Sequence, residues 1–300
     1  MIPRSIQHHP TPGKNFASGD LAGAKRLAAA MRRLTAGLFL AAWVPFGALA
    51  EDMTLTLADG VEMGLVWIGP GEFAMGGIRP LPHDSGGEKV KVRLSSGFYL
   101  GRTEITQQQW VSIMGSRPWE GRPHVVADPQ RPAVFFSWLE LQVFVERLSV
   151  ATGQPLRLPT EAEWEYACRA GEGEGEAGEL DPLAWYYDNT KAAGQRQAMP
   201  VASKRPNLWG LFDMRGNVWE WVADWYSPTY GDARVDAVSA EGVSADGVRI
   251  DPNGPARGSH RVKRGGSFYD FGESLHCGAR DGYSENGRYI NIGARIALDR

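Results

Sequence analysis

Two carboxylates flank a Gly-Asn corner in the stretch GLFDMRGNVWEWVADW, residues 210–225. Asp213 lies seven residues before Glu220, and Glu220 stands between two tryptophans. Calcium takes about six to eight oxygen ligands in loose geometry, so an irregular loop turning at Gly-Asn can direct two carboxylates and main-chain carbonyls to one ion. In the alternative interpretation, Glu220 caps a strand or pairs with Arg215 while the tryptophans pack in the core.

A second group of polar side chains follows the glycines of RGGSFYDFGESLHCGARDGY, residues 264–283. Glu273 and His276 form the candidate catalytic pair, because a carboxyl group tuned by burial and an imidazole that titrates near neutrality can do general acid–base chemistry. The other candidate pocket residues are Tyr269, Asp270, Arg280, Tyr283 and Glu285. For any one of them the simpler interpretation is a solvated polar loop.

Composition limits the class of protein that can carry these residues. The chain has 300 residues, of which 43% are hydrophobic, with 37 glycines and 19 prolines. This composition predicts one globular domain with many loops. The formal charge of -3 comes without a basic stripe, so we expect no nucleic-acid partner. The expected partner is a small-molecule or peptide-derived substrate, and the oligomeric state stays open.

The N-terminal region has the pattern of an export signal. Residues 31–52, MRRLTAGLFLAAWVPFGALAED, combine a basic start, an apolar run and small residues before Glu51. This pattern predicts a leader and secretory signal peptide over 1–50 and a single domain over 51–300, in the periplasm or secreted. The apolar run contains Pro45 and is short for a bilayer span of about 20 residues, so we expect no stable membrane span after cleavage.

The elements that must position the candidate residues are short. Residues 63–77 and 89–106 alternate apolar with polar or small residues, which is typical of antiparallel strands. Three stretches begin with Ser or Thr followed three residues later by Glu or Gln, and each runs into a glycine: 106–115, 137–153 and 160–171. These patterns predict capped helices. The remainder lacks a helical period, so we expect an α+β domain.

Four motifs occur in the order typical of one family. RLPTEAEWEYACRAG (157–171), GLFDMRGNVWEWVADW (210–225), RVKRGGSF (261–268) and NIGARIAL (291–298) resemble successive signatures of the formylglycine-generating enzyme, or sulfatase-modifying factor, family. The resemblance covers roughly residues 62–299. It implies that family's C-type-lectin-like α+β fold, which is low in regular secondary structure.

The resemblance also implies a calcium site. The family holds a calcium ion in the segment that resembles residues 213–220, which assigns as ligands the side chains of Asp213 and Glu220 and the backbone carbonyls of Gly216 and Val218. We expect a structural role for this ion, because an ion that ties loops together compensates for scarce secondary structure.

The cysteines separate this chain from the family's usual chemistry. Formylglycine-generating enzymes oxidise a substrate cysteine with two active-site cysteines that hold copper(I) after Gly-Gly-Ser, whereas here Asp270 and Gly272 stand approximately at those positions. We therefore expect no copper and no formylglycine formation. Cys168 and Cys277 match the family's structural cysteines, which implies a disulfide between them in an exported protein.

Two classes of function follow from this resemblance. The first is an exported oxidoreductase or tailoring enzyme that resembles the cysteine-free periplasmic branch of the family, which takes part in the oxidative maturation of a secreted small molecule such as a pyoverdine-type siderophore. The second is a non-catalytic ligand-binding module, because a C-type-lectin-like scaffold can display a variable C-terminal loop surface for binding.

Overall fold

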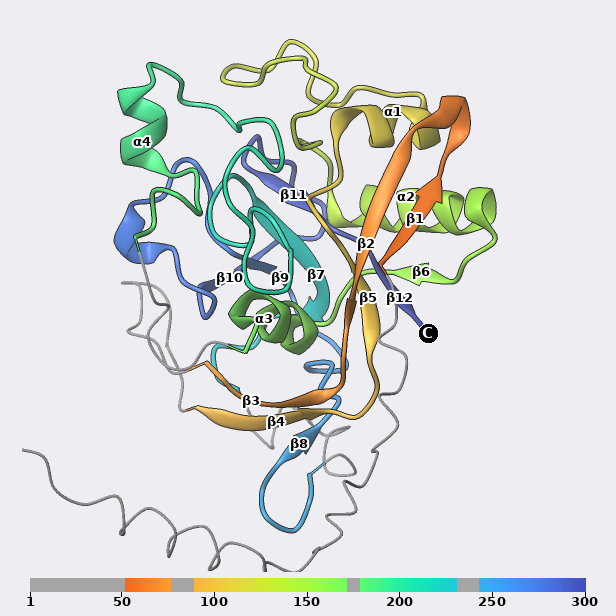
Figure 1. The fold of residues 1–300 in the computed structure, drawn as a ribbon, viewed down its shortest axis with the longest axis vertical. Helices are drawn as coiled ribbons and strands as arrows, with labels where there is room; N and C mark the ends of the chain where they lie inside the picture. Colours follow the sequence, from red (N-terminus) through yellow and green to blue (C-terminus); the bar gives the residue numbers. More distant parts are fainter. Residues whose placement is uncertain (1–51, 77–88, 172–178, 231–242) are drawn as a thin grey trace, which may run out of the picture. The chain divides into compact units, whose positions relative to one another are not determined.

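The N- and C-terminal parts of the domain meet in one antiparallel sheet. The computed structural model describes residues 52–76, 89–171, 179–230 and 243–300. The five-stranded sheet has the order β1-β2-β5-β12-β6. Its strands are β1 (Met53–Thr56), β2 (Glu62–Ile68), β5 (Phe98–Gly101), β12 (Ala297–Asp299) and β6 (Leu156–Arg157). The last strand, β12, therefore lies inside the sheet, between β5 and β6 (Figure 1).

Two smaller sheets complete the strand arrangement. The four-stranded sheet has the order β10-β9-β7-β11, and β11 runs parallel to β7. Its strands are β10 (Arg280–Tyr283), β9 (Arg261–Arg264), β7 (Trp219–Trp225) and β11 (Ile292–Ala294). A three-stranded sheet joins β3 (Gly71–Met75), β4 (Val90–Leu94) and β8 (Arg249–Ile250). Figure 1 shows it beneath α3, away from α1 and α2.

The helices begin where the capping patterns predict. They are α1 (Gln107–Met114), α2 (Trp138–Thr152), α3 (Glu161–Arg169) and α4 (Tyr187–Ala192), with short 3-10 turns η1 (Ala58–Gly60) and η3 (Gly272–Ser274). The first three start with capping boxes at Thr106, Ser137 and Thr160, which confirms the prediction. The third ends one residue early, because Ala170 rather than Gly171 takes the left-handed cap position.

Helix α4 was not predicted from the sequence. It has six residues, too few to show a helical period of apolar side chains. The Asn189 side chain accepts a hydrogen bond from the backbone N–H of Tyr186 at 2.9 Å. The helix therefore begins through a local polar contact, and α4 carries one candidate-site neighbour, Tyr187, described below.

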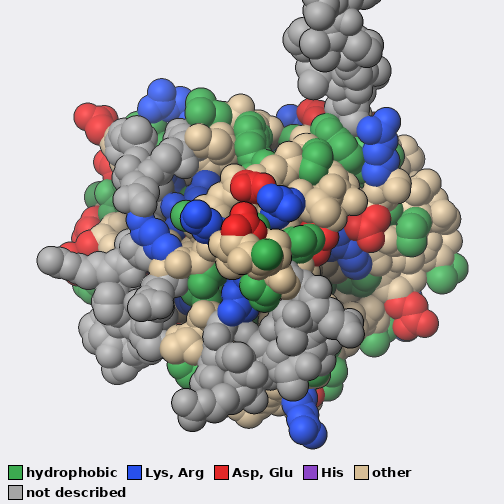
Figure 2. All heavy atoms as spheres, turned by 90° about the horizontal axis from the view of Figure 1, so that it is seen from below, with side chains coloured by type: hydrophobic (Ala, Val, Ile, Leu, Met, Phe, Trp, Pro, Cys, Tyr) green, Lys and Arg blue, Asp and Glu red, His purple; other side chains and the backbone are tan. Residues whose placement is uncertain are grey.

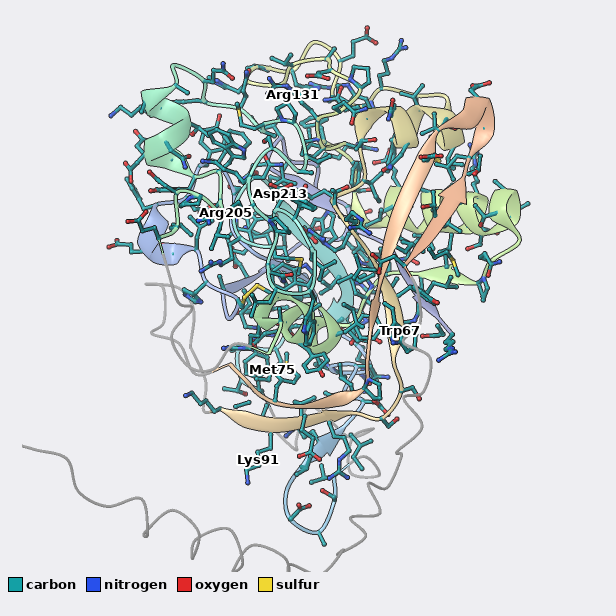
Figure 3. The ribbon with its side chains drawn as sticks, in the orientation of Figure 1. Trp67, Met75, Lys91, Arg131, Arg205 and Asp213 are labelled. Atoms are coloured by element: carbon teal, nitrogen blue, oxygen red, sulfur yellow. A yellow bond between two sulfur atoms is a disulfide. The ribbon has the colours of Figure 1, made fainter. Side chains whose placement is uncertain are left out.

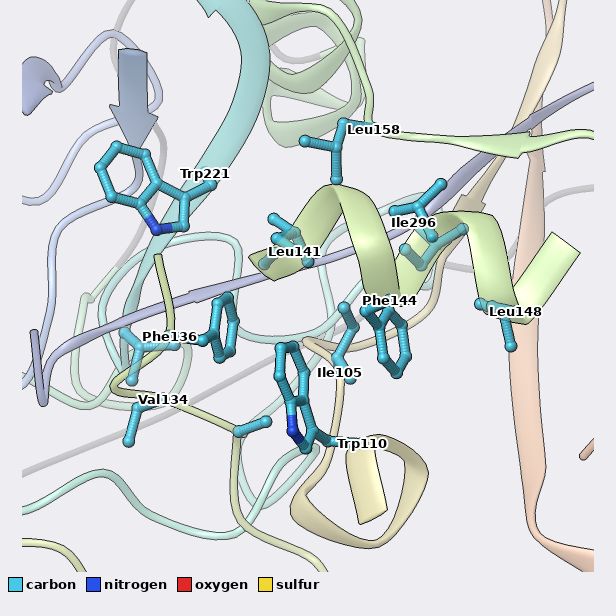
Figure 4. Packing of buried hydrophobic residues seen from close by; sticks show 14 of the residues in the cluster. Ile105, Trp110, Val134, Phe136, Leu141, Phe144, Leu148, Leu158, Trp221 and Ile296 are labelled. Atoms are coloured by element: carbon cyan, nitrogen blue, oxygen red, sulfur yellow. The ribbon is translucent and has the colours of Figure 1, made fainter. Parts of the chain in front are cut away.

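The four-stranded sheet separates two hydrophobic cores. On one side α1 and α2 pack with Trp219 and Trp221 of β7, and Trp110 stacks between Phe136 and Phe144 at centroid distances of 4.3 and 5.1 Å (Figure 4). The other core contains residues of α3, β9 and the small sheet. Because successive side chains of a strand point to opposite faces, neighbouring residues of β7, β9 and β10 serve different cores.

A disulfide joins α3 to the segment before β10. Cys168 bonds to Cys277 with a Cα–Cα distance of 5.5 Å, as predicted, and the two residues are 109 positions apart. These are the two cysteines of the chain. Closing a loop of this length stabilises the folded state by about 4 to 5 kcal/mol in the chain-entropy account.

Some expectations concern residues that the structure does not describe. The predicted leader and signal peptide over 1–50 lie outside the described residues. Within the described ranges, no helix is long and apolar enough to cross a bilayer. Seen from below, the domain has acidic and basic side chains interspersed on its surface (Figure 2). Arg93 of β4 and Glu72 of β3 form an ion pair at 2.6 Å.

Candidate functional site

The Gly-Gly-Ser segment after β9 forms a turn that glycine alone fits comfortably. Gly265 and Gly266 have φ angles of 94° and 77°, in the left-handed region. A Cβ on Gly265 would lie 3.0 Å from both the backbone oxygen of Met214 and the ring of Trp164. Without a Cβ, the backbone at Gly265 passes close to Met214 and Trp164. Ser267, which follows the two glycines, is fully buried at the start of the candidate site.

The turn places the carboxylate of Asp270 within hydrogen-bond distance of two donors. The Ser267 hydroxyl donates to Asp270 Oδ2 at 2.6 Å, and the Trp219 indole N–H donates to the same oxygen at 2.9 Å. Asn291 donates to the Ser267 hydroxyl at 3.2 Å and so helps to orient it. Among the described residues none donates to Asp270 Oδ1, so one carboxylate oxygen is fixed and the other is available to a ligand.

A buried lysine lies on the face of the same tryptophan. Lys263 Nζ is 4.0 Å from the ring centroid of Trp219 and 4.2 Å from that of Tyr283. Its ion-pair partner is Asp281, at 3.2 Å. Burial lowers the pKa of Lys263, and Asp281 and Asp270 oppose this effect. The site therefore combines a held carboxylate with a nearby ammonium group that is only partly solvated.

Aromatic side chains surround Asp270. Tyr269 packs on Phe268 at 4.4 Å and lies 6.2 Å from the ring of His124, and burial raises the pKa of the Tyr269 phenol. The backbone N–H of Tyr187, in α4, donates to the carbonyl oxygen of Asp270 at 2.9 Å. Tyr187 in turn packs at 4.8 Å on Phe271, which is 55% exposed. An exposed aromatic ring therefore follows directly after the held carboxylate.

The structure does not join Glu273 and His276. Glu273 is exposed on η3, and in the described part of the chain no hydrogen bond connects it to His276. Burial, together with the charge of Arg264, lowers the pKa of His276 to about 4. The Nδ1 atom of His276 is buried without a hydrogen-bond partner. The imidazole is therefore neutral at physiological pH. It lies near the guanidinium groups of Arg264 and Arg169.

Arg280 and Tyr283 fall on opposite faces of the four-stranded sheet, because they are three positions apart on β10. Tyr283 faces Lys263, whereas Arg280 forms an ion pair with Glu161 of α3 at 2.6 Å. Glu285 lies 3.5 Å from Arg261 and forms an ion pair with it. Of the predicted pocket residues, the structure thus brings Asp270 to Trp219 and Tyr283 to Lys263, whereas the Tyr269 ring packs on Phe268.

The predicted calcium ligand Glu220 is already bound by protein groups. It is 1% exposed, and its carboxylate accepts two hydrogen bonds from Arg295, each at 2.6 Å, and one from the Trp164 indole at 2.7 Å. Oε1 accepts one of these bonds and keeps a second lone pair. Glu220 could therefore bind an ion only while it also accepts hydrogen bonds from Arg295.

Asp213 offers a freer oxygen. It is 2% exposed, its Oδ2 accepts the backbone N–H of Ala202 at 2.7 Å, and its Oδ1 is buried without a partner (Figure 3 labels Asp213 among the loops beside β7). Burial raises the pKa of Asp213 to about 6. Nearby Glu104 is fully buried, its Oε2 also lacks a partner, and burial followed by the charge of Asp213 raises its pKa well above the ordinary value.

These unpartnered oxygens are what a hard cation binds. In the part of the chain that the structure describes, no three Asp, Glu, His or Cys side chains converge as a metal-ligand group. An ion held by Asp213 would therefore need main-chain oxygens, as the assignment of Gly216 and Val218 requires. Glu104 was missed by the sequence analysis, since a single glutamate between a strand and a helix carries no motif.

Sequence reasoning also missed the groups that hold Asp270. Ser267 and Trp219 both stand in the quoted motifs, which was a usable signal, but nothing in the sequence shows that their side chains meet at one carboxylate. Lys263 also stands in a quoted motif, RVKRGGSF (261–268), but nothing local shows that it lies on the face of Trp219. Chemically, a carboxylate with one oxygen fixed by two donors and the other open can take a proton from a bound ligand or bind a cationic group.

Comparisons with known proteins agree with this architecture. Residues 56–300 match the family described as sulfatase-modifying factor enzyme 1-like domain. The formylglycine-generating enzyme of Streptomyces coelicolor is 34% identical over 209 residues, which cover 63% of this chain and 60% of that protein. The Bos taurus enzyme is 32% identical over 209 residues, covering 63% of this chain and 50% of that enzyme. These matches therefore span only about half to three fifths of the two relatives.

Solved structures show the same fold. Treponema denticola variable protein 1 is 26% identical with a TM-score of 0.69, covering 84% of this chain and all of that chain. PvdO from Pseudomonas aeruginosa is 24% identical with a TM-score of 0.65 and the same coverage, a likeness of fold. The family match over residues 56–300 and the order of its motifs leave one assignment: the chain belongs to the sulfatase-modifying factor enzyme 1-like family.

Proposed function

We propose that this protein is an exported tailoring enzyme that oxidises a secreted small molecule of the pyoverdine-siderophore class, with Asp270 as its general base. The observation that carries the proposal is the pair of hydrogen bonds from Ser267 and Trp219 to Asp270 Oδ2. Asp270 stands in the loop after Gly-Gly-Ser, where the family places its copper-binding cysteines. Ser267 and Trp219 fix a carboxylate there in place of a thiol.

The proposed reaction removes two hydrogens from the substrate. The open Oδ1 of Asp270 accepts a proton from a phenolic or amine-bearing precursor, which leaves an electron-rich anion. Two electrons and the second proton pass to dioxygen, and the proton held by Asp270 completes hydrogen peroxide. Positioned general bases contribute about 10²- to 10⁴-fold to rates. Lys263 lies across Trp219 and offsets the negative charge that develops.

Export and calcium belong to the same proposal. The disulfide between Cys168 and Cys277 supports an oxidising compartment, where such bonds persist. The partnerless Oδ1 of Asp213 supports a structural calcium ion in the loop that precedes β7. Both cysteines are committed to the disulfide, so the proposed chemistry uses no copper–thiolate centre and makes no formylglycine.

The second candidate function is a ligand-binding module without turnover. The structural likeness to Treponema denticola variable protein 1, at 26% identity and a TM-score of 0.69, favours it. The 55% exposed ring of Phe271 beside Asp270 also suits ligand contact. In this alternative, the Asp270 carboxylate binds a cationic ligand group and takes no proton.

Deleting the gene and comparing exported metabolites by mass spectrometry tests the proposal. We expect the deletion strain to accumulate a precursor two hydrogens heavier than the normal product, and the wild-type gene to restore the product. If the exported metabolites of the deletion strain match those of the parent, the oxidative function is wrong and the ligand-binding module takes its place.

A further inference from the structure

A separate cavity lies on the opposite side of the four-stranded sheet from Asp270. Its volume is about 50 Å³. One wall is apolar and comes from the small sheet, with Met75 of β3 and Val90 and Val92 of β4 (Figure 3 labels Met75 on β3, below α3). The polar part of the lining includes Glu161, Asp224 and Arg280. The proposed oxidation uses none of these groups.

The polar wall belongs to a buried network of charges. Glu161 accepts hydrogen bonds from Arg280 at 2.6 and 2.9 Å and from Arg264 at 3.1 Å. Glu165 binds Arg264 at 2.5 Å and Arg169 at 2.6 Å. Three guanidinium groups thus face two carboxylates, so the network carries one more positive than negative charge. Buried charges normally occur in compensated sets, and the excess favours an anion.

Asp224 does not supply the missing negative charge. Its Oδ2 accepts the backbone N–H of Glu161 at 2.7 Å, and the residue is 4% exposed. Burial, followed by the charge of Glu161, raises the pKa of Asp224 to about 8. At neutral pH the side chain is therefore an uncharged acid whose hydroxyl can donate a hydrogen bond.

Arg280 lines the cavity and keeps two N–H groups for which no hydrogen bond is seen among the described residues. A guanidinium has five N–H groups, and Arg280 uses three of them for Glu161 and for the carbonyl oxygen of Ser227, the last at 2.6 Å. The residue lines the cavity, and its guanidinium also lies 4.4 Å from the ring centroid of Tyr230, another lining residue. The loop that carries Gly254 closes tightly over Asp224, because a Cβ on Gly254 would lie 3.0 Å from Asp224 Oδ1.

We propose that this cavity binds a small aliphatic carboxylate of about the size of acetate, with Arg280 and Asp224 donating hydrogen bonds to the anion and Met75 and Val92 contacting its alkyl end. A water needs roughly 10 to 15 Å³ of such volume, so the cavity holds on the order of four heavy atoms. The inference does not depend on the reaction proposed for Asp270.

Thermal unfolding of the purified full chain tests the site with sodium acetate as the probe. At neutral pH and constant ionic strength, acetate should raise the melting temperature in a saturable way relative to chloride, since a ligand that binds only the folded state stabilises it. Butyrate, which is too long for the cavity, should have no effect beyond that of chloride. Equal melting temperatures in acetate and chloride would overturn the proposal.

Variants locate the acetate effect. Val90 lines the cavity and is partly exposed at the start of β4, so Val90→Phe should fill the space without disturbing the core and weaken acetate binding by about tenfold or more. Val243→Phe is the control, because Val243 is exposed and does not line the cavity. An undiminished acetate response in Val90→Phe would exclude this site. Asp270→Asn should leave the response unchanged, which separates this test from the oxidation proposal.

Discussion

At the residue scale, Asp270 and Gly272 stand approximately where the family has its two copper-binding cysteines. Ser267 and Trp219 hold a side chain in the loop after Gly-Gly-Ser, and in this chain that side chain is the carboxylate of Asp270. A carboxylate binds no soft copper ion well but accepts protons readily. In the proposed function, this loop therefore supplies a proton acceptor in place of copper ligands.

The calcium proposal is also tested at this scale. Chelator should lower the melting temperature of the purified protein, and added calcium should restore it, because the ion would bind the folded state only. Asp213→Ala should remove the response, since Asp213 Oδ1 has no other partner. Asp188→Ala, at an exposed acid of α4, serves as the control. A melting curve that chelator leaves unchanged in the parent protein would remove calcium from the account.

At the element scale, short sequence motifs predicted the features that depend on contacts between neighbouring residues, such as the helix starts. The capping boxes at Thr106, Ser137 and Thr160 gave the helix starts because both hydrogen-bonding partners lie within one turn. Strand pairing was not predictable in the same way. The register that sets Arg280 opposite Arg264 and Tyr283 opposite Arg261 depends on contacts between distant segments. This pairing places β10 in the sheet, and the alternation of side chains along β10 then puts Arg280 and Tyr283 on opposite faces.

The family motifs predicted more of the structure than the periodicity of apolar residues did. They placed the disulfide and the fold correctly, because the order of four motifs is specific. They did not reveal that Glu220 is bound by Arg295, nor that Glu104 lies close to Asp213, since both contacts join residues 75 or more positions apart. Contacts between residues that are distant in the sequence cannot be predicted from the spacing of residues within one motif.

The Gly-Gly-Ser turn provides a prediction for one element. Gly265→Ala should lower the free energy of unfolding by more than about 1 to 3 kcal/mol, because φ is 94° and the new Cβ would lie 3.0 Å from Met214 and Trp164. Gly247→Ala is the matched control, since φ is 80° but no atom lies within 4 Å. Denaturant unfolding measures both variants. Equal losses in the two would mean that close packing at the turn contributes nothing.

At the whole-molecule scale, the sheet β10-β9-β7-β11 separates two groups of polar side chains. One face presents Lys263 and Tyr283 to the Asp270 site, and the other presents Arg264 and Arg280 to α3. The disulfide ties α3 to the segment before β10 and so holds the second face closed. The few regular elements are thus joined by a covalent bond and by buried ion pairs.

Stability should depend on pH through Asp224. Its pKa is about 8 in the folded protein and 3.8 ordinarily, so between these values the unfolded chain loses a proton that the folded protein keeps. This group therefore reduces stability as pH rises from about 4 to 8, and its effect is constant above that range. Asp224→Asn, which keeps an acceptor for the Glu161 N–H, should show a smaller loss over this range in urea unfolding. Identical pH slopes in parent and variant would contradict the assignment.

The central claim is that Asp270 acts as a base in an oxidation. The most direct measurement complements the gene deletion with Asp270→Asn and quantifies the exported precursor and product by mass spectrometry. Asparagine still accepts the bonds from Ser267 and Trp219 but does not take a proton. We predict that Asp270→Asn leaves the precursor two hydrogens heavier, as in the deletion, while the exposed control Asp188→Asn restores the product. Full restoration of the product by a folded Asp270→Asn protein, with the parent's melting temperature, would contradict the account.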